Sequence, residues 1–62
     1  MDRRPSKVEQ VTERIAEMLF DFPDGDDNVW FWQEELGALA SEGNLIGLQD
    51  LYDEVREQWQ WL

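Results

Sequence analysis

Hydrophobic side chains recur at helical spacing in three separate stretches of the chain. The first stretch follows Ser6-Lys7-Val8-Glu9, which has the pattern of a capping box. It ends at Phe22-Pro23, because proline disfavours the helical conformation in the residue before it. The second stretch follows the turn-forming residues 23–28, in which Asp26, Asp27 or Asn28 is a suitable N-cap. Gly43 is typical of a helix end, and Asn44 is typical of a new helix start. The pattern predicts helices over about 7–22, 28–42 and 45–61.

The hydrophobic positions of each stretch define the side of the helix that we expect to face a common core. At 100° per residue they fall on one face, and no stretch of useful length alternates in the manner of a β-strand. The expected inward positions are Val8, Val11, Thr12, Ile15, Met18, Leu19 and Phe22, then Val29, Trp32, Leu36, Leu39 and Ala40, and finally Leu48, Leu51, Tyr52, Val55, Trp59 and Leu62.

The connections between the predicted helices are short, about six and two residues, which favours antiparallel neighbours. We therefore predict an all-α fold, a small three-helix bundle formed by a single domain over residues 6–62. The alternative is a protomer resembling a helical hairpin that completes its core by forming a dimer. Residues 1–5 precede the first N-cap and are predicted to be a disordered N-terminal arm.

Charge is abundant and unevenly distributed. The 62 residues include 5 Lys and Arg and 15 Asp and Glu, for a net charge of -10. Four of the cations lie within residues 1–14, whereas residues 15–62 contain only Arg56. Direct binding to nucleic acid or to an anionic membrane is therefore not expected, because both carry the same sign of charge. A basic protein surface is the natural complement. A domain of this size buries only about 60% of its unfolded surface, so dimerisation or burial against a partner is also expected.

Residues with obvious catalytic or metal-binding chemistry are few. The chain has no Cys and no His. This excludes metal sites built from thiolate or imidazole ligands, and catalysis by Cys or His. Asp24, Asp26, Asn28 and Glu35 have the spacing of a calcium-binding EF-hand loop, but Val29 stands where that loop requires glycine. We interpret the stretch as an acidic helix-capping loop. The sequence predicts no catalytic residue, no metal site and no cofactor, and thus no enzyme.

The longest apolar run is residues 29–32, far too short to span a membrane, and no secretory signal is visible. A cytoplasmic location is the expectation that follows.

Several large aromatic side chains fall off the predicted inward faces. Trp30, Phe31 and Trp61 project among acidic residues, including Glu34 and Glu35. An aromatic centre with a charged rim is typical of a protein interface, and Trp is favoured among residues that dominate binding energy. Phe20 and Ile46 also lie off the stripes. The alternative is that these residues seal the ends of a bundle whose hydrophobic stripes are wide.

Three functions are compatible with this pattern. The first is a non-enzymatic interaction module, an adaptor or inhibitor that docks Trp30, Phe31, Trp61, Glu34 and Glu35 on a basic partner. The second is an acidic decoy that imitates nucleic acid and blocks a DNA- or RNA-binding protein. The third is a homodimer whose seam is the aromatic patch. Salt separates the first two, because a decoy depends on charge and aromatic anchors do not.

Overall fold

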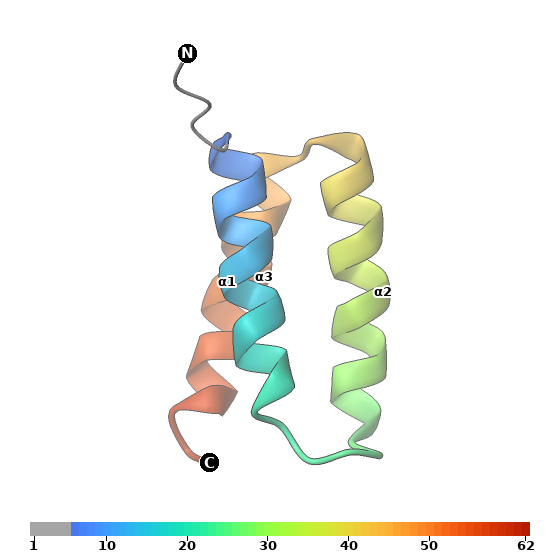
Figure 1. Ribbon diagram of the computed structural model, residues 1–62, viewed down its shortest axis with the longest axis vertical. Coiled ribbons are helices and arrows are strands. Elements are labelled where there is room, and N and C mark those ends of the chain that lie inside the picture. Colours follow the sequence, from blue (N-terminus) through green and yellow to red (C-terminus); the bar gives the residue numbers. More distant parts are fainter. Residues whose placement is uncertain (1–5) are drawn as a thin grey trace.

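The computed structural model describes residues 6–62, which form three α-helices. Helix α1 spans Lys7–Phe20, α2 spans Asp27–Glu42 and α3 spans Leu45–Trp59. Consecutive helices run antiparallel, so that α1 and α3 point the same way (Figure 1). The predicted three-helix bundle is therefore confirmed, and it forms within one chain, without the dimer that the hairpin alternative required. The arm predicted over residues 1–5 lies outside the described residues.

Side-chain caps begin all three helices. The Ser6 hydroxyl accepts a hydrogen bond from the Glu9 amide at 3.2 Å. An Asp26 carboxylate oxygen accepts from the Asn28 amide at 2.9 Å, and the Asn44 side-chain oxygen accepts from the Gly47 amide at 3.0 Å. Each bond satisfies an amide that has no partner within its helix. Local sequence therefore sets where each helix begins.

Helix α1 ends at Phe20, two residues before the predicted boundary. The amides of Asp21 and Phe22 donate to the carbonyls of Met18 and Leu19, at 3.1 and 3.2 Å, and thus tighten the last turn. A turn closed from the Asp26 amide to the Pro23 carbonyl follows, with Gly25 at a φ of 89°. Glycine tolerates this left-handed backbone without strain. Phe22 leaves the helix but remains buried.

The core lies between the three helices and consists of hydrophobic side chains only. Phe22 and Trp32 meet edge to face across the α1–α2 connection, with ring centroids 5.3 Å apart and an interplanar angle of 72°. Every buried residue was predicted to face inward, because angular position along a helix determines which side chains are available to a core. The buried residues are Ile15, Met18, Leu19, Phe22, Trp32, Leu36, Leu48, Leu51 and Val55.

Two residues predicted to face inward do not belong to the core. Trp59 is 39% exposed and Leu62 is 63% exposed. Trp59 is the last residue of α3. The chain then turns, and the Leu62 amide donates a hydrogen bond to the Trp59 carbonyl at 3.1 Å. At this end α1 has already finished, and the last residues of α3 continue beyond it toward the C-terminus (Figure 1).

Two glycines within helices differ in their surroundings. A Cβ added at Gly47 would lie 2.5 Å from Leu39 Cδ2 and 3.0 Å from the capping Asn44 side chain. Gly47 therefore lets the start of α3 pack closely against α2. A Cβ added at Gly37 would meet nothing within 4 Å. Gly37 therefore makes no close approach to a neighbour within the described chain.

We expect Leu48→Ala to lower the free energy of unfolding by about 2–5 kcal/mol, because Leu48 is fully buried and truncation leaves a cavity. Urea unfolding followed by circular dichroism measures the change. Ile46→Ala is the control. Ile46 lies in the first turn of α3 but is exposed, so its truncation should change stability by less than about 0.5 kcal/mol. Equal losses in the two variants would contradict the assigned core.

Gly37→Ala should stabilise the fold by about 1 kcal/mol, because alanine favours a helix interior and the added methyl enters open space. Gly47→Ala should gain clearly less or lose stability, since Leu39 and the Asn44 cap must both shift. Parallel thermal and urea melts measure the difference. An equal gain at both positions would show that α2 and α3 are not closely packed at Gly47.

Candidate interaction surface

The exposed large hydrophobic side chains gather at one end of the bundle. This end is where α1 and α3 finish and α2 begins (Figure 1). Every Phe and Trp of the chain lies within residues 20–32 or 59–61. We call the exposed members of this group, with the neighbouring terminal leucine, the aromatic end: Phe20, Trp30, Phe31, Trp59, Trp61 and Leu62. Ile46, another exposed large hydrophobic residue, is near the start of α3 at the opposite end.

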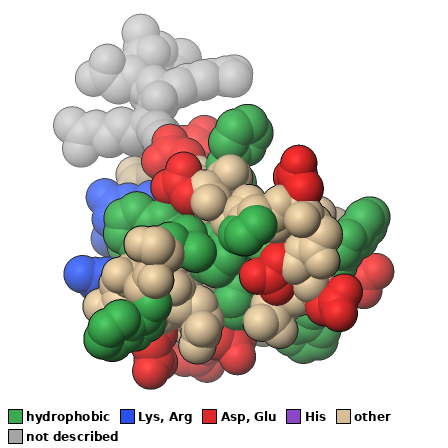
Figure 2. Space-filling view, turned by 90° about the horizontal axis from the view of Figure 1, so that it is seen from below, with side chains coloured by type: hydrophobic (Ala, Val, Ile, Leu, Met, Phe, Trp, Pro, Cys, Tyr) green, Lys and Arg blue, Asp and Glu red, His purple; other side chains and the backbone are tan. Residues whose placement is uncertain are grey.

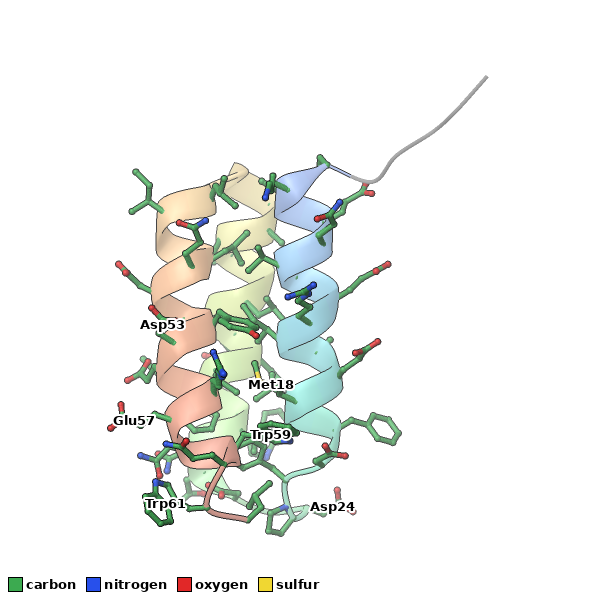
Figure 3. All side chains as sticks on the ribbon, turned by 90° about the vertical axis from the view of Figure 1, so that its left-hand side faces the viewer. Met18, Asp24, Asp53, Glu57, Trp59 and Trp61 are labelled. Atoms are coloured by element: carbon green, nitrogen blue, oxygen red, sulfur yellow. The ribbon has the colours of Figure 1, made fainter. Side chains whose placement is uncertain are left out.

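The aromatic residues predicted to bind a partner are all exposed, but the structure distributes them around α2 and α3. Trp30, Phe31 and Trp61 are between 57% and 81% exposed. Trp30 lines a groove between α1 and α2, where it is joined by Phe20. Phe31 lines a second groove, between α2 and α3, with Glu35. Trp61 follows the last turn of α3 (Figure 3). The three predicted aromatics therefore share one end of the molecule but not one groove.

The groove between α1 and α2 has a volume of about 960 Å³ and is open to solvent. Its base consists of the core residues Leu19, Phe22 and Leu36, with the half-buried Val29. Its sides are Ala16 and Phe20 from α1, and Trp30 and Gln33 from α2. Phe20 is 91% exposed although it stands beside this apolar base. The loop residues Pro23, Asp24, Gly25 and Asp26 close one end of the groove.

The groove between α2 and α3 is smaller, about 520 Å³, and more acidic. Phe31 and the half-buried Leu39 provide apolar surface, and Glu35, Asp50 and Glu54 line its margin. Glu34, which was predicted to act beside Glu35, is exposed on α2 but does not line this groove. Glu35 is therefore the acidic residue that the structure brings to Phe31.

Positive charge is confined to one side of the bundle. Among the described residues, the cations are Lys7, Arg14 and Arg56. All three line shallow hollows between α1 and α3. No Lys or Arg occurs between Arg14 and Arg56, so α2 and both connections carry none. Seen from the aromatic end, the Lys and Arg side chains stand together at one edge, whereas acidic side chains alternate with hydrophobic ones around the remainder (Figure 2).

A hydrogen bond ties the end of α3 to the α1–α2 connection. The indole Nε1 of Trp59 donates to Asp21 Oδ2 at 2.8 Å. Trp59 is directed from α3 toward the end of α1, whereas Trp61 points away from the bundle (Figure 3). Sequence reasoning missed this pair because 38 residues separate its members. The bond explains how an indole predicted to be a core residue is accommodated at the surface.

No desolvated polar cluster is found in the part of the chain that the structure describes. Within residues 6–62, no polar or charged residue is buried, and no three His, Cys, Asp or Glu side chains converge as metal ligands. The acidic loop residues cap α2 through Asp26. Among the helices described, none has the length and apolar character that crossing a bilayer requires.

Comparisons of the chain with protein-family models, with curated proteins and with solved structures find no match. Because a fold of this kind serves many unrelated functions, function is argued from the surface itself.

A double-mutant cycle of Trp59→Phe and Asp21→Ala should show a coupling of about 0.5–1.5 kcal/mol, since each single change already removes the 2.8 Å hydrogen bond. Urea unfolding of the four proteins provides the measurement. Asp24→Ala is the control, because Asp24 is a nearby loop acid outside this bond, and its effect should add to that of Trp59→Phe. Full additivity for Asp21→Ala would contradict a stabilising bond.

Proposed function

We propose that this chain is a small acidic, non-enzymatic protein–protein interaction module, an adaptor or inhibitor, that docks its aromatic end on a basic partner surface. The observation that carries the proposal is the concentration of exposed aromatic side chains at one end of a bundle whose core is formed by other residues. Large exposed apolar surface of this kind marks interaction sites in small proteins. Trp and Phe provide large contact area at low conformational cost and are enriched at the centres of interfaces.

Charge supports a basic partner. The net charge is -10, and no cation occurs between Arg14 and Arg56. The charged side chains that line the two grooves beside α2 are therefore all carboxylates. Such a surface accelerates encounters with a positively charged protein and opposes binding to anionic surfaces. Two copies of this chain repel each other, which disfavours a homodimer. A cytoplasmic setting stays a prediction of the sequence.

Anchoring by aromatic side chains also distinguishes this function from that of an acidic decoy. Carboxylates that imitate phosphates need no exposed indoles, yet Trp30 and Trp61 are among the most solvent-exposed side chains of their size in the described chain. The hydrophobic part of an interface is insensitive to salt, whereas a purely ionic one weakens steeply. The two functions therefore differ in a measurable way.

The tagged protein should capture a stoichiometric partner from lysate of its source cells in about 0.1 M salt, and retain it in about 1 M salt, where charge is screened within about 3 Å. Trp30→Ala and Trp61→Ala should each reduce capture by more than about tenfold, as expected for central aromatic anchors. Ile46→Ala, which removes an equally exposed side chain from the other end, should capture as the natural sequence does. Circular dichroism should show unchanged helix content in all three variants.

Three outcomes would contradict the proposal. Release of the partner in high salt, with displacement by DNA or RNA, would identify an acidic decoy instead. Recovery of the bait alone, together with a dimer in sedimentation equilibrium, would identify a self-assembling protein. Loss of helix content in both Trp variants would show that these residues stabilise the bundle and are not held for a partner.

A further inference from the structure

The groove between α1 and α2 has the form of an unfilled helix position. Its base is the apolar core itself, formed by Leu19, Phe22 and Leu36, and it lies between two antiparallel helices. The groove is lined by residues between 16 and 20 of α1 and between 29 and 36 of α2, so it is about 12 Å long and seats about two turns of an incoming helix. Amphipathic helices dock in grooves of this construction by placing apolar side chains on the base.

The sides of the groove combine aromatic walls with small residues. Phe20 and Trp30 stand on opposite sides and are both mostly exposed. Ala16 lies one turn before Phe20 and lines the groove. Gly37 lies just beyond the groove, seven residues after Trp30 and on the same side of α2. Gly37 is unfavourable within a helix, and no neighbour in the described chain occupies the space beside it. That space permits close approach of another backbone.

The charged residues around the groove favour an occupant of positive charge. Asp24 and Asp26 line its closed end, and no Lys or Arg lines it. Lys7, Arg14 and Arg56 all lie in the hollows between α1 and α3. The α2–α3 groove is also free of cations, but it is about half as large, and Leu39 already fills the space at Gly47. Size and apolar lining therefore select the α1–α2 groove for a helix, and Asp24 and Asp26 set the sign of the charge at its closed end.

We infer that the α1–α2 groove binds one amphipathic helix that carries Lys or Arg at the end of its apolar face that meets the α1–α2 connection, as a fourth helix of the bundle. This inference rests on the proposed function, and names the part of the partner that is bound. The occupant's apolar side chains contact Leu19, Leu36 and the two aromatic walls, and its cations face Asp24 and Asp26. A second copy of this acidic chain does not meet the requirement.

The direct test is a titration of the full chain with a helical Leu/Lys peptide of about 16 residues, followed by calorimetry and by amide chemical shifts. We expect one peptide per chain and the largest shifts at residues 16–20 and 30–37. Two matched peptides serve as controls. A Leu/Glu peptide of the same pattern tests charge, and a scrambled Leu/Lys peptide tests amphipathicity. Both should bind at least tenfold more weakly.

The groove is tested separately by two neutral substitutions of the same kind. Ala16→Trp fills the groove and should weaken binding of the Leu/Lys peptide at least tenfold. Ala38→Trp places the same side chain at an exposed alanine of α2 outside the groove and should leave binding unchanged. Gln33→Trp, with Ala38→Trp as its control, repeats the comparison if Ala16→Trp does not fold, because Gln33 also lines the groove.

Several results would overturn the inference. These are no binding of the Leu/Lys peptide up to about 1 mM, equal binding of the scrambled peptide, shifts centred on the α2–α3 groove, or equal effects of Ala16→Trp and Ala38→Trp. Failure here is distinguishable from failure of the proposed function. A cellular partner that still depends on Trp30 and Trp61 but is captured by Ala16→Trp would refute the groove and retain the module. A partner insensitive to Trp30 and Trp61 would refute the module itself.

Discussion

The contact between Phe22 and Trp32 is the constraint on which the rest of the structure depends. Phe22 lies in the core although α1 has already ended, so the connection must turn inward before α2 begins. The turn that follows, with Gly25 in a left-handed conformation, brings Asp26 to the start of α2 as its cap. That placement puts Trp30 and Phe31 in the first turns of α2, where Trp30 shares a groove with Phe20 and Phe31 faces α3. The aromatic end is therefore a consequence of how the α1–α2 connection buries Phe22.

Helix packing is unequal around the bundle, and the difference shapes the surface. Gly47 lets α3 approach α2 until Leu39 occupies the space beside it. No equivalent contact closes α1 against α2, where a groove reaches the core residues Leu19 and Leu36. Cations gather on the α1–α3 side and leave the open side acidic. Shape thus favours the α1–α2 side for the basic helix proposed above, and no cation of the described chain lines that groove to oppose it.

If the chain binds a partner as proposed above, its small size connects stability with binding. A small domain with nine buried side chains among residues 6–62 gains little from its own core. A partner that covers Phe20, Trp30 and the groove base adds apolar burial to the folded state only, and therefore stabilises it by mass action. Exposed aromatics that contribute little to the free chain become part of a larger core in the complex. Burial of apolar surface then stabilises both the fold and the complex.

Sequence by itself determined the helices, their caps and the buried residues, because these depend on hydrogen bonds between near neighbours and on the angular spacing of side chains along a helix. It also placed Trp30, Phe31 and Trp61 outside the core. Only the tertiary structure decided that Trp30 joins Phe20 whereas Phe31 joins Glu35, since spacing gives a direction but not the neighbour found there. The tertiary structure also decided that Trp59 and Leu62 are exposed and that Trp59 is hydrogen-bonded to Asp21. These outcomes depend on where the three helices end relative to one another, which no single stretch of sequence specifies.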